Sequence, residues 1–486
     1  MKRLSSLDAQ FLAAESGNFG SQYCGVAVFD TSKHRIDAAV MRERLTRIVP
    51  NCAPLHSKII EVPFGLDHPI AVETDVDLND HVTESTVDST DEKALSVEVA
   101  RILATNLDRS RPLWRLRVIH GLPGRTAIVL TVHHAVADGG AANEILSALF
   151  DGSAPPSSVA TGRKALHPKR TELARAGLAS LPKRWTTSLG TIGETLAHLD
   201  QVPALRALPG VHRVASRKRG DAGAVRLDAP RTRFNTRLSP ERSVAFGTVS
   251  LDVIKAVKNK YGYTVNDVVI ALCAGALRRR MLATGELPSQ PLVVYIPVSV
   301  RAPDAQARFG NAISSIIAPI PTHLADVESR LKFAHHTMAI AKRRTQLAPP
   351  TLLADVNDPI PTPIFGMAAR GLMRLISSRF VRPPVNLIIS NVAGSPGEQT
   401  LSGAPLLATF PISVVFNSFA LNITVVSYQN GLDIGIVGDA VALPDQWELL
   451  EDFHRELADL AELADLAALA PTQEKAEHTA KLVLDI

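Results

Sequence analysis

The sequence predicts a mixed α/β (α+β) protein with two sheet-containing domains, and three observations lead to this prediction. The chain has 486 residues, more than one hydrophobic core normally holds. Short apolar runs typical of strands alternate with longer stretches of helical periodicity in both halves. A Gly-, Ser- and Pro-rich stretch at residues 151–162 separates the halves. We therefore expect domains at residues 1–152 and 225–470, a connecting segment at 153–224 and a peripheral tail at 471–486.

The first half begins with a helical pattern after Ser5, a residue type that commonly caps helices. The turn sequence Gly121–Gly124 separates the last two expected strands. Helices are expected at residues 7–12, 38–48, 94–107 and 141–150, and strands at 25–29, 56–62, 114–119 and 127–132.

The second half repeats this mixture over a similar length. Residues 429–431, Gln-Asn-Gly, indicate a hairpin between two of its strands. Helices are expected at residues 251–261, 266–282, 324–344 and 443–463, and strands at 291–300, 312–320, 386–390, 421–428 and 432–437.

The charge balance excludes an obvious nucleic-acid binder, because the net charge is only +4. The charge is nevertheless uneven. Residues 163–242 contain 17 Lys and Arg against 6 Asp and Glu. This basic segment is either a solvated linker or an electrostatic surface for anionic lipid or a phosphorylated cofactor.

The mean hydropathy of +0.09 is high for a protein of this size. No stretch reaches the roughly 18 uninterrupted apolar residues that a spanning helix needs. The basic N-terminal residues are not followed by the apolar region of a secretory signal. Cys24, Cys52 and Cys273 are scattered, which favours reduced thiols and a cytoplasmic location. We expect a protein that can meet lipid without crossing it.

The richest motif is His133-His134-Ala-Val-Ala-Asp138-Gly139, between an expected strand and an expected helix. Adjacent strand residues point in opposite directions, so only one of the two histidines can face a given cleft. Asp138 lies where the helix could start, and its carboxylate can accept backbone N–H groups or pair with a buried arginine. Gly139 and Gly140 permit a tight turn or the close approach of another segment. The alternative is a purely structural histidine pair.

This motif matches the HHxxxDG signature of the CoA-dependent acyltransferase superfamily, which includes chloramphenicol acetyltransferase and the condensation domains of peptide synthetases. The chain as a whole, over about residues 4–465, resembles the bacterial wax ester synthase/diacylglycerol acyltransferase family. Ala393 stands where that family frequently has a proline. The other blocks occur in the family's order: Leu4–Asp8 with Phe11 and Leu12, Arg111–Trp114, Asn266–Val269, Pro297–Arg301, Gly310–Asn311, and Ser390–Val392 with Gly394 and Pro396.

The resemblance implies two chloramphenicol-acetyltransferase-like domains, each a mixed sheet flanked by helices, with the active site in a tunnel between them. It implies that His134 is the general base, which takes the proton of an acceptor hydroxyl and passes it to the leaving CoA thiolate. His133 would support this base. Asp138 and Gly139 would hold the loop, and no covalent acyl-enzyme is needed because a thioester is already activated.

Four further residues are expected to line the site: Asn266, Asp267, Ser390 and Asn391. Each also has a structural explanation. Asn266 could be a helix N-cap, and Asp267 would be favoured in a first helical turn by the helix dipole. Ser390 and Asn391 end a strand and could simply form a turn.

The resemblance implies long-chain acyl-CoA as co-substrate and diacylglycerol or a fatty alcohol as acceptor, with no cofactor and no metal. The sequence also lacks the GxSxG, GxxxxGK and HExxH patterns. Such acceptors imply a protein associated peripherally with the inner membrane or lipid droplets. Residues 361–382 and the basic segment are the candidate lipid contacts. A non-catalytic lipid-binding or lipid-droplet protein, or an acyltransferase for a polyketide alcohol or an amine, is the alternative.

Overall fold

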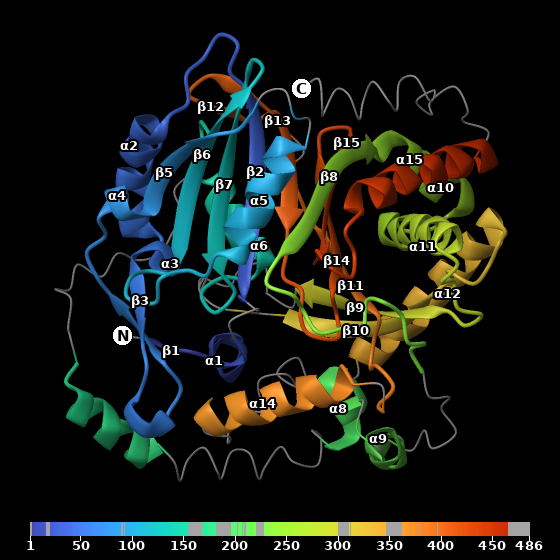
Figure 1. Ribbon diagram of the computed structural model, residues 1–486, viewed down its shortest axis with the longest axis horizontal. Coiled ribbons are helices and arrows are strands. Elements are labelled where there is room, and N and C mark those ends of the chain that lie inside the picture. Colours follow the sequence, from blue (N-terminus) through green and yellow to red (C-terminus); the bar gives the residue numbers. More distant parts are fainter. Residues whose placement is uncertain are drawn as a thin grey trace.

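Two six-stranded mixed sheets form the body of the protein in the computed structural model (Figure 1). The structure describes residues 2–15, 20–88, 91, 93–153, 168–180, 196–201, 203–206, 208, 210–219, 228–299, 311, 313–346, 362–378, 380–395 and 397–464. The expected tail at 471–486 lies outside these residues, as does much of the connecting segment 153–224.

The first sheet has the order β12-β13-β2-β7-β6-β5. Its neighbours pair antiparallel except β5 and β6, which are parallel. The strands are β2 (Gln22–Asp30), β5 (Val82–Thr86), β6 (Trp114–Leu122), β7 (Arg125–His133), β12 (Thr400–Leu401) and β13 (Ala404–Ile412). A separate three-stranded sheet consists of β1 (Lys2–Arg3), β4 (Ile70–Glu73) and β3 (Ser57–Ile60).

The second sheet has the order β10-β9-β11-β14-β15-β8. Its central strand β11 runs parallel to both neighbours, and the other pairs are antiparallel. The strands are β8 (Arg242–Ser250), β9 (Leu292–Ser299), β10 (Ile313–Ile320), β11 (Leu387–Val392), β14 (Leu421–Tyr428) and β15 (Gly431–Asp439). The expected pair of mixed sheets is therefore confirmed.

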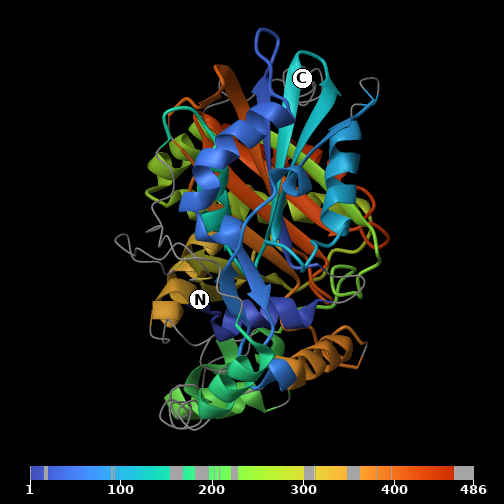
Figure 2. The same ribbon diagram turned by 90° about the vertical axis from the view of Figure 1, so that its left-hand side faces the viewer.

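Helices cover both sheets (Figures 1 and 2). The α-helices of the first half are α1 (Ser6–Ala14), α2 (Ala38–Ile48), α3 (Ala53–His56), α4 (Leu78–His81), α5 (Ala94–Ala104) and α6 (Gly139–Ser147). Residues 170–180 are helical, and α8 (Pro203–Arg206), α9 (Val211–Arg219), α10 (Leu251–Tyr261), α11 (Val265–Ala283), α12 (Val327–Gln346), α14 (Thr362–Ile376) and α15 (Gln446–Leu463) follow. Short 3-10 turns are η1 (Val49–Asn51), η2 (Pro63–Gly65) and η3 (Leu199–Gln201).

Helix α11 is the centre of the second core, because twelve of its nineteen residues are buried and it packs against α15, α12 and α10. Gly275 of α11 lies directly under the Glu456 carboxylate, and a Cβ at this position would be 1.9 Å from Glu456 Cδ. Glu456 is in turn paired with Arg330 of α12, at 2.5 Å between Oε1 and Nη2. The small residue therefore allows a buried ion pair to cross the helix.

The two halves are joined by shared structure as well as by the connecting segment. Strands β12 and β13 lie within residues 225–470, yet they extend the first sheet by pairing with β2. The expected boundary at residue 225 therefore does not separate the sheets. Helix α5 also packs against β8, and Trp447 Nε1 of α15 donates to Ser96 Oγ of α5 at 3.3 Å. Among the described helices, none combines the length and the apolar composition that a membrane span needs.

Candidate active site

The HHxxxDG motif forms a strand, a turn and a helix in succession. His133 is the last residue of β7, and the turn after it is tied to the start of β2 by a hydrogen bond from His134 N to Ser21 O (2.7 Å). Asp138 is the N-cap of α6, because its Oδ1 accepts the backbone N–H of Ala141 at 2.8 Å. The helix thus starts at Gly139, two residues before the expected start. No atom of the described residues comes within 4 Å of the place where a Gly139 Cβ would be.

The His134 ring is buried and has no hydrogen-bond partner among the described residues. The residue is 8% exposed, and its ring stacks on Phe11 of α1 with centroids 5.0 Å apart. Neither Nδ1 nor Nε2 makes a hydrogen bond to a described residue. Burial lowers the pKa of His134 to about 4, although Asp138 and Asn311 partly oppose this. At neutral pH the ring is therefore a neutral imidazole with a free nitrogen lone pair.

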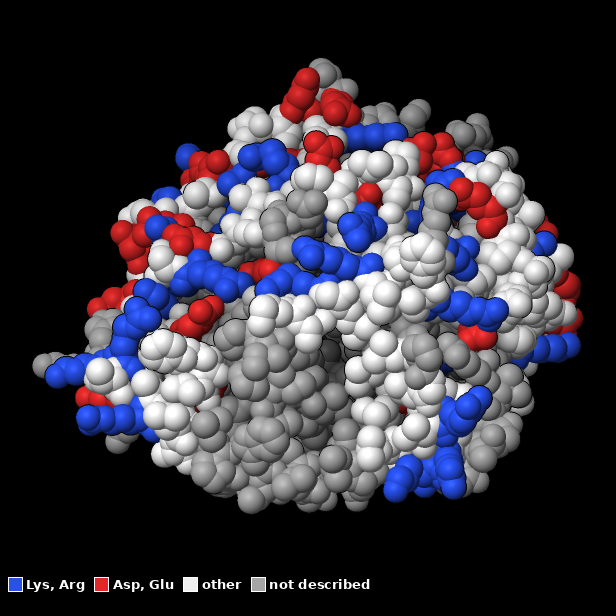
Figure 3. Space-filling model, turned by 60° about the horizontal axis from the view of Figure 1, so that its bottom comes forward, with Lys and Arg blue, Asp and Glu red and all other residues white. Residues whose placement is uncertain are grey.

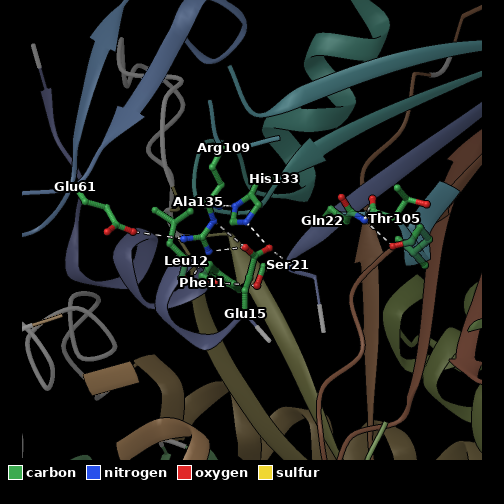
Figure 4. Close-up of polar contacts among 11 residues, drawn as sticks. Phe11, Leu12, Glu15, Ser21, Gln22, Glu61, Thr105, Arg109, His133 and Ala135 are labelled. Carbon is green, nitrogen blue, oxygen red and sulfur yellow. Dashed lines mark hydrogen bonds and ion pairs between the residues drawn. The ribbon is translucent and has the colours of Figure 1, made fainter. Parts of the chain in front are cut away.

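Both ring nitrogens of His133 make hydrogen bonds (Figure 4). Its Nδ1 accepts the backbone N–H of Ala135 at 2.9 Å, so the ring proton is on Nε2. Nε2 lies 2.8 Å from Glu15 Oε1, to which it donates. Burial alone would raise the pKa of Glu15, but the hydrogen bonds from His133 and Arg109 outweigh it and hold the value at about 2. Glu15 thus stays ionised and fixes one tautomer of His133.

Arg109 ties this network to α1. Its Nη2 donates to the backbone oxygen of Leu12 at 2.7 Å and also to Glu15. Sequence reasoning named neither Glu15 nor Arg109. The only signal was the Leu4–Asp8 and Phe11–Leu12 block, which precedes Glu15 on the same short helix.

A second network joins residues that are far apart in the sequence. The side chain of Asn311 donates through Nδ2 to Asp8 Oδ1 (2.7 Å) and to the backbone oxygen of His134. The Asn311 backbone N–H also reaches Asp8 Oδ1, at 2.9 Å. Asp8 belongs to the capping box that starts α1 at Ser5, and burial raises its pKa. Two of the resemblance blocks therefore meet at the backbone of the HHxxxDG turn.

The structure gives Asp267 a role away from this turn. Thr264, not Asn266, is the N-cap of α11, and Asp267 completes its capping box with Oδ2 3.1 Å from Thr264 N. The same oxygen is 2.9 Å from Nδ1 of His335 on α12. Between described residues, no hydrogen bond or ion pair joins Asn266 or Asp267 to His134. The expectation that Asp267 lines the site has no support in these contacts.

Ser390 and Asn391 lie at the end of β11, opposite Thr424 and Val425 of β14. Just beyond them, the backbone oxygen of Ala393 accepts from Asn143 Nδ2 of α6 at 3.5 Å. Gly394 allows the chain to pass close to β14, because a Cβ would be 1.7 Å from Ser427 O. This block therefore lies beside the helix that follows the HHxxxDG turn. Arg301, in another of the blocks, lies outside the described residues.

A small cavity and the lack of a metal-binding cluster among the described residues also bear on the chemistry of the site. A small cavity between the halves is lined by Gln22, which pairs with His133 across β2 and β7, and by Arg242 of β8. Among the described residues, no group of three or more His, Cys, Asp and Glu side chains is placed to hold a metal ion. The described arrangement provides a buried neutral imidazole, a second histidine held by a carboxylate, and a capped helix between them and β11.

Comparison with known proteins identifies the same family along almost the whole chain. Residues 4–269 match the wax ester synthase/diacylglycerol acyltransferase catalytic domain, and residues 309–461 match the C-terminal domain of that family. A putative diacylglycerol O-acyltransferase of Mycobacterium tuberculosis is 33% identical over 476 residues, which cover 95% of this chain and 90% of the relative. A probable diacylglycerol O-acyltransferase of the same species is 29% identical, covering 93% and 97%.

Solved structures agree with the family and with the fold. The wax ester synthase/diacylglycerol acyltransferase from Marinobacter aquaeolei VT8 superposes with a TM-score of 0.66 and 25% identity, covering 96% of this chain and 100% of that one. The first condensation domain of the calcium-dependent antibiotic synthetase has a TM-score of 0.54 at 17% identity, covering 97% and 98%, and shows the shared fold. The chain therefore belongs to the wax ester synthase/diacylglycerol acyltransferase family and is an acyltransferase of that type.

Proposed function

We propose that this enzyme transfers a long-chain acyl group from acyl-CoA to the free hydroxyl of diacylglycerol, giving triacylglycerol, with His134 as the general base. The proposal rests on one observation above all: the buried His134 ring is neutral and has both nitrogens free of partners among the described residues. The names of the mycobacterial relatives support diacylglycerol as acceptor. A structure of a starter condensation domain described as a complex with C8-CoA supports acyl-CoA as donor in this fold.

The chemistry needs one proton carrier. His134 takes the acceptor's proton as the hydroxyl oxygen attacks the thioester carbonyl, and the C–O bond forms. The tetrahedral intermediate then collapses, the C–S bond breaks, and the protonated imidazole gives its proton to the CoA thiolate. No covalent acyl-enzyme and no resident cofactor enter this sequence. His133, held by Glu15, keeps the turn and the base in place.

The substrates imply where the enzyme works. Diacylglycerol and long-chain alcohols reside in bilayers and lipid droplets, so we propose peripheral association with the inner membrane or with droplets. Ser390 and Asn391 are the candidates for contact with substrate from the second half, because β11 ends beside α6. A fatty alcohol is the second acceptor to test, since the Marinobacter structure is described as a wax ester synthase as well.

The test is release of free CoA thiol from palmitoyl-CoA by the purified protein, with thin-layer chromatography of labelled products. Dioleoylglycerol should give labelled triacylglycerol, and hexadecanol is the comparison acceptor. His134→Ala should abolish acceptor-dependent release, whereas His336→Ala, at an exposed position of α12, should leave it unchanged. An undiminished rate in His134→Ala would overturn the mechanism. Absence of release with every alcohol would overturn the proposed reaction.

A further inference from the structure

The lower end of the molecule is a layer of short helices beneath both sheets (Figures 1 and 2). It consists of the β3–β4 hairpin tip (62–67), the helical residues 170–180, α8, α9, and α14 with the turn that follows it to residue 380. We call this set the basal layer. Gly177 packs on the hairpin tip, where a Cβ would lie 2.9 Å from Leu66 Cβ, and Ser180 Oγ donates to Asp67 Oδ2 at 3.2 Å.

Large apolar side chains are concentrated on the surface of this layer. Of the eleven that are exposed among the described residues, six belong to it. Phe380 is 95% exposed and Phe64 is 89% exposed. The other four are Leu178, Val214, Met367 and Leu375. Met367 and Leu375 are two helical turns apart on α14, so they form one exposed stripe while Ile376 of the same helix is buried. Exposed apolar groups gathered in this way indicate a contact surface.

Phe64 provides an independent indication. Its backbone has φ 59°, a left-handed conformation that is strained for a bulky residue. Hydrogen bonds from Gly65 N to Val62 O (3.0 Å) and from Leu66 N to Pro63 O (3.3 Å) hold this tip. The strain presents an aromatic ring to solvent, where it gains no packing within the chain. A partner outside the chain would account for both features.

The layer also carries unpaired positive charge. Six exposed cations lie on it, and none of them forms an ion pair with a described residue: Arg170, Arg175, Arg213, Arg217, Lys218 and Arg374. Figure 3 brings this end of the molecule forward and shows Lys and Arg at its two sides and a hollow near the middle. Apolar groups rimmed by cations complement the apolar interior and anionic headgroups of a lipid bilayer.

Among the described residues, helix α1 connects the basal layer to the candidate base. Arg370 Nη1 of α14 donates to the backbone oxygen of Ala13 in α1 at 2.7 Å. Gly366 allows this close contact, because a Cβ there would be 3.0 Å from the same oxygen. On α1, Phe11 stacks against the His134 ring. A lipid held at the basal layer would therefore lie close to the reacting groups.

We propose that the basal layer docks on an anionic lipid bilayer, with Phe64, Phe380 and the exposed stripe of α14 in the boundary between headgroups and acyl chains. The cations of α9 and of residues 170–180 then meet the headgroups. This inference rests on the proposed use of a lipid acceptor and adds the face of the enzyme that meets the lipid. It gives the acceptor a short path toward α1 and His134.

The experiment is sedimentation of the full chain with phosphatidylcholine vesicles, with and without about one third phosphatidylglycerol. Phe64→Ser combined with Met367→Ser should lower binding to both vesicles by about ten-fold, because two apolar side chains no longer leave water. The triple variant Arg213→Gln, Arg217→Gln and Lys218→Gln should lose binding only to the anionic vesicles. Controls outside the layer are Val441→Ser, at another exposed apolar residue, and the triple Lys33→Gln, Lys255→Gln and Lys332→Gln.

A second measurement reports insertion directly. The native Cys24, Cys52 and Cys273 are all buried, so a fluorophore should react selectively with a Phe64→Cys variant. Its emission should be quenched by a lipid-borne quencher in the vesicles. Binding of the layer variants equal to that of the unmodified chain, or no quenching, would overturn the proposal. Light scattering that shows a dimer dissociated by Phe64→Ser would also overturn it, because a second copy would then cover the face.

Failure of this proposal can be told from failure of the proposed reaction. Thiol release with a short water-soluble alcohol, without vesicles, should be the same for the layer variants and the unmodified chain. If no alcohol supports thiol release, the reaction fails while the vesicle result still stands. If release is normal and binding is unaffected by the variants, the docking face is wrong and the reaction stands.

Discussion

The burial of His134 determines the pH range in which it can act as a base. Its pKa is lowered to about 4, so the ring should remain neutral in the free enzyme well below the ordinary value. We expect kcat/KM for thiol release to be nearly constant from about pH 8 to about pH 5.5, whereas an imidazole of ordinary pKa would lose about ten-fold over this range. A rate profile measured alongside circular dichroism tests this. A midpoint near pH 6.5 in a folded protein would contradict it.

Asn311 is expected to position the turn that carries the base. Its Nδ2 is shared between Asp8 and the backbone oxygen of His134, so Asn311→Ala removes both contacts. We expect kcat to fall roughly ten- to hundred-fold with little change in KM for acyl-CoA, because a displaced base affects the chemical step. Asn143→Ala is the matched control, since its amide makes only a 3.5 Å contact to Ala393 O. An equal loss in both variants would argue against a specific role of Asn311.

The residues around His134 show which parts of the site the sequence alone could predict. The HHxxxDG spacing was sufficient to single out His133, His134 and Asp138, because they are consecutive on one strand–turn–helix unit. Glu15 and Asn311 reach the turn only through folding, from 118 and 177 residues away. For Asp267 the role in the site stays a prediction, because the contacts of its carboxylate are those of a helix capping box and of His335.

Elements with local signals were predictable and elements with distant partners were not. Helix α10 has the predicted bounds, because Ser250 caps its start and Gly262, at φ 71°, ends it. Strand β13 was not predicted. It contains Pro405 and Pro411, which argue against a strand, and its partner β2 lies in the other half of the sequence. Its pairing depends on the packing of the whole molecule and not on its own residues.

Asp433 of β15 makes the junction between the two sheets sensitive to pH. Its carboxylate accepts from Thr248 Oγ1 of β8 at 2.6 Å and from Thr409 N of β13 at 2.7 Å. Burial raises the pKa of Asp433 to about 7, although these hydrogen bonds partly oppose it. Because the folded-state pKa is raised, its contribution to stability is fully present below the ordinary carboxyl pKa and is lost as pH rises through about 7.

Asp433→Asn should therefore stabilise the protein at about pH 8, on the order of 2 kcal/mol, with a smaller gain at about pH 5. The amide can still accept from Thr409 N and donate to Thr248 Oγ1, so the junction keeps its hydrogen bonds. Urea unfolding at the two pH values measures the difference. The exposed Asp445→Asn serves as the control. A gain that is the same at both pH values would show that the Asp433 carboxyl does not titrate as expected.

At the scale of the whole molecule, strand β13 makes the two halves one folding unit, because it belongs to the second half of the sequence and pairs in the first sheet. In a chain that ends at residue 224, β13 is missing and β2 becomes an exposed edge of nine residues, eight of which are buried in the full protein. Its α5 also loses the contact with β8. An apolar strand with an unpaired edge is prone to associate with other chains. We therefore expect this fragment to aggregate although it contains the entire HHxxxDG motif.

The full chain should instead unfold in one cooperative transition, because the core shared by α5, β2, β8 and β13 must open when either sheet does. Differential scanning calorimetry of the full chain, with the solubility of the fragment, tests both expectations. As a control, a fragment of residues 1–224 co-expressed with residues 225–486 should recover solubility, since the second piece restores β13. Two separate transitions in the full chain, or a soluble monomeric fragment that ends at residue 224, would show that each half folds alone. In that case β13 would be an addition to a complete first domain.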